Sequence, residues 1–298
     1  GMRTRLRKSR TVHTAFRWVQ CGAMNKLFKR IRKKMDINFL TWNLKNNTDS
    51  DFYTELNSFA FKKEIDIIVL QECFSDIENE LQDYCEISDF LNSKGKRWVR
   101  IFLNRKSKLD FDSATSYSTN KMRCAEIKTA KGFRFNLIGL HLYSQSGKSK
   151  KQQLYDNKKI PTYIQEFETK QKNEKTIIIG DINYRPFDIE LEQADFINSN
   201  SDRNVIRLLE TKELEKHNYR FFYNPMWNIL GDYDLARQKP KVSGTFYWYP
   251  DDIEKYHWNL IDGVLLSPLV MDKILIDTIR IHTKFNGAEL VKSSITKR

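Results

Sequence analysis

The sequence predicts an α/β protein of the α+β type, in which mixed or antiparallel β-sheets are covered by helices. Two observations lead to this prediction. Short apolar runs bounded by polar turns, which are typical of strands, outnumber the stretches with helical spacing, so βαβ crossovers cannot join all of the strands. In addition, residues 35–298 contain no internal repeat, low-complexity block or Pro/Gly/Ser-rich linker. We therefore expect a single domain over residues 35–298.

Strands are expected where short stretches are mainly apolar or aromatic and are bounded by turn residues. In chain order these are residues 37–42, 65–70, 98–103, 122–127, 133–142, 176–179, 219–223, 245–249, 260–266 and 274–281. The run of Ile177, Ile178 and Ile179 is the clearest example, and Gly180 ends it. Consecutive β-branched residues suit a strand that is buried on both faces.

Helices are expected where apolar residues recur every three or four positions. Phe52, Leu56 and Phe59 have this spacing in the first predicted helix. The other predicted helices are residues 76–84, 150–172 and 203–215. Pro161 lies within the segment 150–172 and should break or kink that helix, because proline has no backbone N–H group to donate.

The positive charge of the chain is concentrated at its N-terminus. The formal net charge is +13, from 51 basic and 38 acidic residues. Residues 1–34 contain twelve Lys or Arg and no acid, which leaves 39 basic residues against 38 acidic ones in the remainder. We expect residues 1–34 to be a disordered extension; an arm for nucleic acid or a membrane surface and a targeting peptide are the alternatives. The domain itself is nearly neutral.

The four cysteines, Cys21, Cys73, Cys85 and Cys124, are far apart and form no CxxC pair. This pattern suits a reducing compartment and argues against a structural zinc site, so we expect a cytoplasmic protein. No run approaches the roughly 18 apolar residues that a membrane-spanning helix needs.

Polar residues that can bind a metal or a phosphate stand where four predicted strands end: Asn43, Glu72, His141, and Asp181 with Asn183. Each has an ordinary explanation when taken alone, as a turn residue, a solvated strand end or a hydrogen-bonded core histidine. Four strand ends that meet at one rim would instead form a site. If the chain stays extended after its strand, Asp181 and Asn183 point to the same side.

These residue types suit the cleavage of a phosphodiester. Glu72 and Asn43 offer oxygen ligands for a hard cation such as Mg²⁺. Asp181 can orient or deprotonate a water molecule, while Asn183 and His141 can donate hydrogen bonds to oxygens that gain negative charge. The set contains no nucleophilic Ser or Cys with a nearby base, so a water nucleophile is the simpler interpretation.

The chain resembles the endonuclease/exonuclease/phosphatase superfamily, which includes pancreatic-type deoxyribonucleases, abasic-site endonucleases, deadenylases, inositol polyphosphate 5-phosphatases and sphingomyelinases. The matching motifs occur in the order of that family. They are Thr-Trp-Asn-Leu at 41–44, Gln-Glu at 71–72, Gly-Leu-His-Leu at 139–142, Gly-Asp-Ile-Asn at 180–183 and, more faintly, Ser-Gly-Thr at 243–245 and Asn-Leu-Ile-Asp-Gly at 259–263.

This resemblance implies a four-layer sandwich, in which two packed β-sheets are flanked by helices and the metal lies at one end. It implies that Asn43 and Glu72 hold Mg²⁺ or Mn²⁺. It also implies that His141 contacts the phosphate, that Asp181 aligns the attacking water and that Asn183 stabilises the transition state.

The end of the chain departs from the family, which closes with a Ser-Asp-His-type motif and one more core strand. By resemblance Asp262 would support that final histidine, but no Asp-His pair follows it up to Arg298. His282 is a poor substitute, because it lies in a predicted strand. Either the chain stops short of the motif, or its activity is weak, altered or absent. We favour truncation or loss, because a missing core strand leaves an unpaired sheet edge.

The leading functional hypothesis is metal-dependent phosphodiester hydrolysis, with nucleic acid as the expected partner. Asn43 and Arg185 are the predicted substrate-binding residues, and Arg185 could act with Lys148, Lys150 and Lys151 as a basic stripe along the phosphates. The nearly neutral domain weakens the case for a polynucleotide. A phosphatase for small phosphate esters of the inositol phosphate type, and an impaired relative that only binds phosphate-bearing partners, remain as alternatives.

Overall fold

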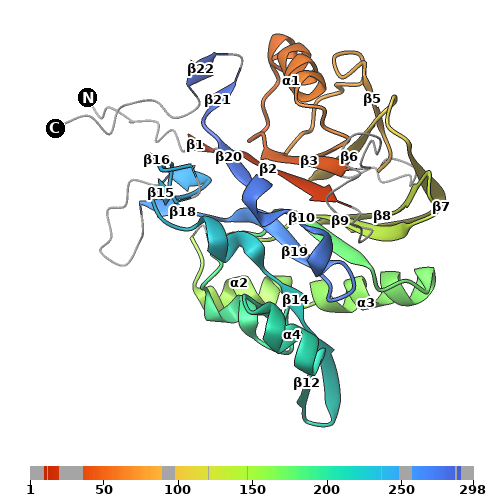
Figure 1. Cartoon of the computed structure of the whole chain (residues 1–298), viewed down its shortest axis with the longest axis vertical. Coiled ribbons are helices and arrows are strands. Elements are labelled where there is room, and N and C mark those ends of the chain that lie inside the picture. The colour runs from red at the N-terminus through yellow and green to blue at the C-terminus, as the bar shows by residue number, and fades with distance from the viewer. Residues whose placement is uncertain are drawn as a thin grey trace, which may run out of the picture.

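The computed structural model describes residues 10–11, 13–19, 36–88, 98–119, 121–145, 147–235, 237–247, 257–285 and 287–289. Two large β-sheets pack face to face, with α1 on one outer side and α2 and α3 on the other (Figure 1). The predicted four-layer arrangement of mixed sheets flanked by helices is therefore confirmed. Within the described part of the chain, no helix is both long enough and apolar enough to cross a membrane.

The first sheet has six strands in the order β20-β2-β3-β4-β6-β5. The strands are β2 (His13–Val19), β3 (Asp36–Asn43), β4 (Ile67–Gln71), β5 (Tyr84–Glu86), β6 (Val99–Asn104) and β20 (Arg280–His282). Strands β3 and β4 are parallel, and the other pairs are antiparallel. The carboxyl ends of β3 and β4 therefore lie at the same edge of the sheet.

The second sheet has seven strands in the order β11-β14-β19-β10-β9-β8-β7. They are β7 (Leu109–Thr119), β8 (Met122–Thr129), β9 (Arg134–His141), β10 (Thr176–Asp181), β11 (Ser199–Asn200), β14 (Phe222–Tyr223) and β19 (Asp262–Leu266). Strands β9 and β10 are parallel, whereas β19 runs antiparallel to β10. The beginning of β19 therefore lies beside the ends of β9 and β10.

The helices are α1 (Ser50–Lys62), α2 (Lys150–Asn157), α3 (Ile160–Gln171) and α4 (Arg203–Leu209). Pro161 stands in the first turn of α3, where its missing N–H group has no helical partner to lose. It thus separates α2 from α3, as predicted. The short 3₁₀ helices are η2 (Ile189–Glu192), η3 (Pro225–Ile229), η4 (Met271–Lys273) and η5 (Ile276–Thr278).

The remaining strands are short and lie outside the two large sheets. They are β1 (Arg10–Thr11), β12 (Thr211–Leu214), β13 (His217–Arg220), β15 (Tyr233–Asp234), β16 (Lys239–Pro240), β17 (Phe246–Tyr247), β18 (Trp258–Asn259), β21 (Lys284–Phe285) and β22 (Ala288–Glu289). Strands β17 and β18 pair antiparallel with each other. They place residues 245–247 beside the beginning of β19.

The hydrophobic core has three layers. Ile177 and Ile179 of β10 point between the two sheets, where they join a cluster with β3, β4 and β6. Ile178 points to the opposite face, where it packs with Ile164 and Phe167 of α3. A third cluster joins the outer face of the first sheet to α1. Strand β10 is therefore buried on both faces, as its run of isoleucines predicted.

Three predicted elements differ from the structure. Residues 76–84, predicted as a helix, form turns. The side chains of Ile77 and Leu81 are buried, but the segment is too short for cooperative helix growth. The helix predicted at 203–215 ends at Leu209, since Glu210 has a positive φ of 56° and the chain then reverses into β12. The strand predicted at 274–281 is interrupted by η5, and only its last two residues belong to β20.

The expectation of disorder for residues 1–34 is wrong for residues 13–19. These residues form β2, which pairs with β3 along six positions and with β20 on its other side. Without β2, the backbone groups of β3 on that side would lack partners within the sheet. The ordered part of the chain therefore begins before residue 35, while the rest of 1–34, apart from β1, lies outside the described residues.

Candidate functional site

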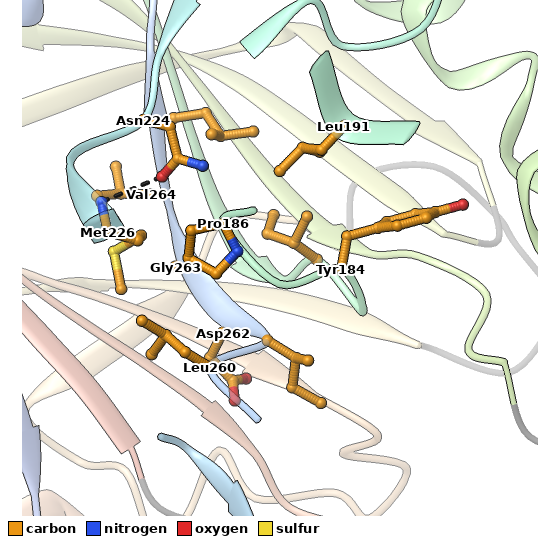
Figure 2. Close-up of a pocket in the computed structure, with 12 residues that line it drawn as sticks. Tyr184, Pro186, Leu191, Asn224, Met226, Leu260, Asp262, Gly263 and Val264 are labelled. Atoms are coloured by element: carbon orange, nitrogen blue, oxygen red, sulfur yellow. Dashed lines mark hydrogen bonds between the residues drawn. The ribbon is translucent and has the colours of Figure 1, made fainter. Parts of the chain in front are cut away.

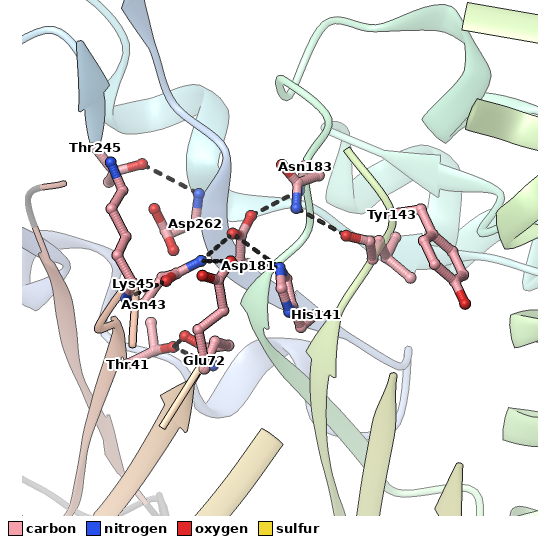
Figure 3. Close-up of polar contacts among 12 residues, drawn as sticks. Thr41, Asn43, Lys45, Glu72, His141, Tyr143, Asp181, Asn183, Thr245 and Asp262 are labelled. Carbon is pink, nitrogen blue, oxygen red and sulfur yellow. Dashed lines mark hydrogen bonds and ion pairs between the residues drawn. The ribbon is translucent and has the colours of Figure 1, made fainter. Parts of the chain in front are cut away.

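Strand register brings the predicted site residues together at one end of the two sheets. In the second sheet, Asp181 of β10 lies opposite His141 of β9 on one side and Asp262 of β19 on the other. In the first sheet, Asn43 ends β3, and Glu72 directly follows β4. Figure 3 shows the side chains of Asn43, Glu72, His141 and Asp181 converging in the space between these strand ends.

Gly180 allows close packing at this point, both against β9 in its own sheet and against Gln71 of the first sheet. It has a φ of +146°, and a Cβ atom there would lie 2.0 Å from the carbonyl oxygen of Leu140 and 3.0 Å from Nε2 of Gln71. Gln71 in turn donates from Nε2 to Oγ1 of Thr41 (3.0 Å), and both side chains are fully buried. A glycine at 180 is therefore required by the backbone conformation and by the packing beneath the site.

Asn43 links the two sheets. Its Nδ2 donates to Oδ2 of Asp181 (2.9 Å) and to Oε1 of Glu72 (3.2 Å), while its Oδ1 accepts from the backbone N–H of Lys45 (2.9 Å). Glu72 has a positive φ of 51°, and its backbone N–H donates to the carbonyl of Trp98 (3.0 Å). The Glu72 side chain keeps 27% of its surface exposed, so its carboxylate is open to solvent.

His141 is held as a neutral, buried ring. Its Nε2 lies 3.4 Å from Oε1 of Glu72 and 3.7 Å from Oδ2 of Asp181. Burial lowers the pKa of His141 to about 3, and the charge of Lys121 adds to this effect. A neutral ring that faces two carboxylates presents its N–H group from Nε2. His141 can therefore donate a hydrogen bond at physiological pH without carrying a charge.

Asp181 is the central acid of the cluster and is only 4% exposed. Burial raises the pKa of Asp181 to about 7, the hydrogen bond from Asn43 opposes this rise, and the charge of Glu72 adds to it. A carboxylate with a pKa near neutrality exchanges a proton readily at physiological pH. Asp181 thus has the protonation behaviour of a general base.

Asp262 is buried beside Asp181, at 3% exposure. Among the described residues, neither of its carboxylate oxygens has a hydrogen-bond partner. Burial raises the pKa of Asp262 well above its ordinary value, and the neighbouring charge of Asp181 adds to the rise. Oγ1 of Thr245 accepts from the backbone N–H of Asp262 (3.2 Å) and so fixes the start of β19.

Asn183 is in a turn, so the condition of extended backbone, under which it and Asp181 would point to the same side, is not met. It has a positive φ of 55°, and its backbone N–H donates to Oδ1 of Asp181 (3.1 Å), which closes an Asx-type turn. Its Nδ2 donates to the carbonyl oxygen of Leu142 (2.8 Å). The turn therefore orients Asp181, and a contact of Asn183 with substrate stays a prediction.

The side chains of Arg185 and His282 make local contacts outside the cluster. Arg185 was predicted to bind substrate, and His282 was considered as a substitute for the final histidine of the family. Nη2 of Arg185 pairs with Oδ1 of Asp188 (2.7 Å), so its charge is held within a local turn. Substrate binding by Arg185 stays a prediction. The ring of His282 packs against Phe59 of α1 at 5.4 Å between centroids, and burial lowers the pKa of His282 to about 4.

Two lysines flank the cluster and were missed by sequence reasoning. Nζ of Lys121 lies 4.0 Å from the ring centroid of Trp98 and 4.5 Å from that of Tyr143. Burial lowers the pKa of Lys121, and the charges of Glu72 and Asp181 oppose this effect. Lys45 follows Asn43 by two residues, which is the signal that could have identified it. No pattern in the sequence marks Lys121, because its position depends on how β8 pairs with the next strand, β9.

Of two cavities in the described chain, the smaller borders the site at Asp262 and the larger lies elsewhere. A small cavity of about 10 Å³ lies behind β19 and is lined by Tyr184, Pro186, Leu191 and Met226 among others (Figure 2). It has room for about one water molecule. A hollow of about 1100 Å³ lies against α3 and β13. The cluster around Asp181 lies at the rim of strand ends, where the Glu72 side chain is 27% exposed and Asp181 is 4% exposed.

The rim offers few protein ligands for a metal ion. Within the described residues, no group of three or more His, Cys, Asp and Glu side chains is arranged to hold a metal. Magnesium, however, commonly binds through one or two protein oxygens and completes its shell with water and phosphate oxygens. The exposed carboxylate of Glu72 fits that requirement. The Asn43 amide directs its Nδ2 at Glu72 and its Oδ1 at the backbone N–H of Lys45, so binding of a metal by Asn43 stays a prediction.

No family model and no curated protein matches the chain. Among solved structures, an endonuclease/exonuclease/phosphatase family protein from Bacteroides thetaiotaomicron is 17% identical, with 78% of this chain and 83% of that chain covered and a TM-score of 0.47. A mannosyl-6-phosphatase from the same organism is 17% identical, with 78% of this chain and 85% of that chain covered and a TM-score of 0.48. The human nocturnin catalytic domain is 13% identical, with 78% of this chain and 82% of that chain covered and a TM-score of 0.45.

The first of these proteins carries the name of the superfamily that the sequence motifs resemble. With identities under 25% and TM-scores under 0.5, these likenesses by themselves assign neither an activity nor a substrate. The case for a function therefore rests on the rim itself: a buried acid with a pKa near neutrality, a neutral imidazole, and an exposed carboxylate beside an amide.

Proposed function

We propose that the protein hydrolyses phosphate esters, and specifically phosphodiesters, with the help of Mg²⁺ or Mn²⁺. The observation that carries the proposal is the position of Asp181, whose pKa is raised to about 7 at a rim that also holds Asn43, Glu72 and His141. Ester cleavage by water needs three groups: a base with a pKa near neutrality, a hydrogen-bond donor for the phosphate and a carboxylate that can bind a cation. The rim contains all three.

Each residue of the rim has a definite task in this proposal. Asp181 accepts a proton from the attacking water, and the turn at Asn183 fixes the direction of its carboxylate. His141 donates from Nε2 to a phosphate oxygen. Glu72 and Asn43 would hold the metal ion, which withdraws negative charge from the phosphate. Asp262 is buried behind Asp181, and its raised pKa keeps its carboxyl group protonated to a higher pH than usual.

Nucleic acid is the substrate that we propose. The side chains of Trp98 and Tyr143 lie next to His141 and Lys121, and Tyr143 is 38% exposed. Aromatic rings beside basic side chains suit stacked bases and their phosphates. Nζ of Lys148 also approaches the Tyr143 ring, at 5.3 Å. Small phosphate esters are the alternative substrates, and the assay below includes them.

The test is a cleavage assay with DNA, RNA and bis(p-nitrophenyl) phosphate, in Mg²⁺, in Mn²⁺ and in chelator. We expect cleavage in metal only, and we expect Glu72→Gln and Asp181→Asn to lower kcat by roughly 10²- to 10³-fold, the loss typical of removing one base or one charge-stabilising group. Glu213→Gln on the exposed strand β12 is the matched control and should retain full activity.

Cleavage that survives both Glu72→Gln and Asp181→Asn would refute the proposal, and so would equal rates in metal and in chelator. Cleavage of the small ester alone would reject nucleic acid as the substrate while retaining the chemistry. Binding of nucleic acid by wild-type protein without any turnover would instead favour a protein that only binds phosphate-bearing partners.

A further inference from the structure

Lys45 has a backbone position that is fixed by the site itself. Its φ is 50° and that of Asn46 is 56°, so two consecutive residues other than glycine are in the left-handed region. Each such residue costs on the order of 1 kcal/mol or more and persists only where its surroundings enforce it. The backbone N–H of Lys45 donates to Oδ1 of Asn43, and that of Asn46 donates to the carbonyl of Glu72 (2.9 Å each).

The side chain of Lys45 extends along the rim next to Asp262 (Figure 3). Its Nζ lies 4.9 Å from the ring centroid of Phe246, and the preceding residue, Thr245, binds the backbone of Asp262. Burial lowers the pKa of Lys45, and the charges of Glu72, Asp181 and Asp262 oppose this effect. The short segment that begins β17 thus positions the lysine and the buried aspartate together.

The charge of the cluster calls for such a cation. Three carboxyl groups, those of Glu72, Asp181 and Asp262, share a small volume, and the two oxygens of Asp262 lack hydrogen-bond partners among the described residues. An anionic phosphate that enters this volume is repelled by each of these groups that is ionised. Lys121 is only 8% exposed and is covered by two aromatic rings, whereas Lys45 is exposed at the rim.

We propose that Lys45 is a phosphate-binding residue of this site and contacts the phosphate group of the substrate from the Asp262 side of the cluster. The inference rests on the proposed function for the identity of the ligand as a phosphate. A lysine ammonium group is a compact charge on a flexible stem, and it binds phosphate oxygens by charge-assisted hydrogen bonds.

The test measures binding without turnover, by isothermal titration calorimetry with inorganic phosphate in buffer that contains Mg²⁺. The wild-type protein is compared with Lys45→Met, Lys45→Arg and the control Lys212→Met on exposed β12. We expect Lys45→Met to weaken phosphate binding roughly tenfold to hundredfold, the range for one hydrogen bond to a charged group. Lys45→Arg keeps the charge and should restore most of the affinity, and Lys212→Met should leave it unchanged.

Thermal melting of each variant separates loss of the contact from loss of the fold, because the Lys45 side chain packs on the surface. Equal phosphate affinity of Lys45→Met and wild type would overturn the inference, as would equal losses in Lys45→Met and Lys212→Met. Absence of phosphate binding by the wild-type protein would also overturn it. If phosphate binds as expected but no ester is cleaved, the proposed function fails while Lys45 remains a phosphate-binding residue.

Discussion

The two sheets contribute to the rim in different ways. The first sheet supplies Asn43 and Glu72, which are tied to their neighbours by side-chain hydrogen bonds and leave one carboxylate open to solvent. The second sheet supplies His141, Asp181 and Asp262, which form a row across three paired strands and are at most 5% exposed. One half is thus accessible to ligands, and the other is nearly sealed from water.

This difference separates two tasks that a hydrolytic site must combine. Burial in the second sheet raises the pKa values of Asp181 and Asp262 and lowers that of His141, so this half determines which groups carry protons. The first sheet adds an exposed carboxylate and, through Lys45, an exposed cation, so this half is suited to contact ligands. Substitutions that act on one half alone can test the division.

The largest effect is expected from Gly180→Ala, which acts where the halves meet. The new Cβ atom would lie 2.0 Å from the carbonyl oxygen of Leu140, and the φ of +146° disfavours any side chain. The strands β9 and β10 would have to separate, so we expect a loss of roughly 4 kcal/mol in the free energy of unfolding, at the upper end for single substitutions. Urea denaturation measures this value.

Gly132→Ala is the matched control for that substitution. Gly132 also has a positive φ, +79°, but a Cβ atom there would meet no other atom within 4 Å. Only the backbone penalty of roughly 1 kcal/mol should remain. Similar losses for the two variants would show that the close approach of the strands at Gly180 contributes nothing to stability.

Much of the part of the site that lies on the second sheet could be predicted from the sequence, because it depends on local patterns. Ile177 to Ile179 form an apolar run that is buried on both faces, and the polar residue that ends such a strand must lie at a sheet edge. The sequence left two conformations open at Asn183, an Asx-type turn and extended backbone, and the structure has the turn. A positive φ in an asparagine follows from the Asx hydrogen bond to Asp181, and the same residues also permit extended backbone.

Features that depend on contacts between distant segments were not predictable. Strand β2 lies within a segment whose basic composition indicated disorder, and it is ordered by pairing with β3 and β20. Lys121 reaches the rim because its backbone carbonyl accepts from the N–H of His141 (2.9 Å), a contact between two neighbouring strands of the sheet. Composition and periodicity describe single segments and carry no information on such pairings.

A smaller effect, dependent on pH, is expected from Asp262→Asn. Because the pKa of Asp262 is raised in the folded protein, the folded state binds more protons than the unfolded state above pH 3.8, and stability falls as the pH rises through the raised pKa. Asparagine stays neutral at every pH. The variant should therefore be as stable as wild type at pH 4 and more stable at pH 8, with a rise of roughly 2–4 °C in Tm per 1 kcal/mol recovered.

Thermal melting of both proteins at the two pH values checks this prediction. His141 has the opposite dependence, since its lowered pKa makes the folded state lose stability as the pH falls below 6.5, but it is present in both proteins and cancels in the difference. A Tm difference that is the same at pH 4 and pH 8 would show that Asp262 is not protonated by its burial.

The smallest effect is expected from Asn43→Ala. This substitution removes the hydrogen bond from Asn43 of the first sheet to Asp181 of the second and changes neither sheet otherwise. The hydrogen bond from Nδ2 of Asn43 favours the ionised form of Asp181, so its loss should raise the pKa of Asp181 further above 7, by about one unit for a hydrogen bond to a charged group. Carboxyl ¹³C NMR titration of the metal-free protein measures the shift. Asn57→Ala, which removes an equivalent 2.9 Å contact to Asp83, should leave Asp181 unchanged. An unchanged pKa of Asp181 in Asn43→Ala would mean that the second sheet sets the protonation of the site without help from the first.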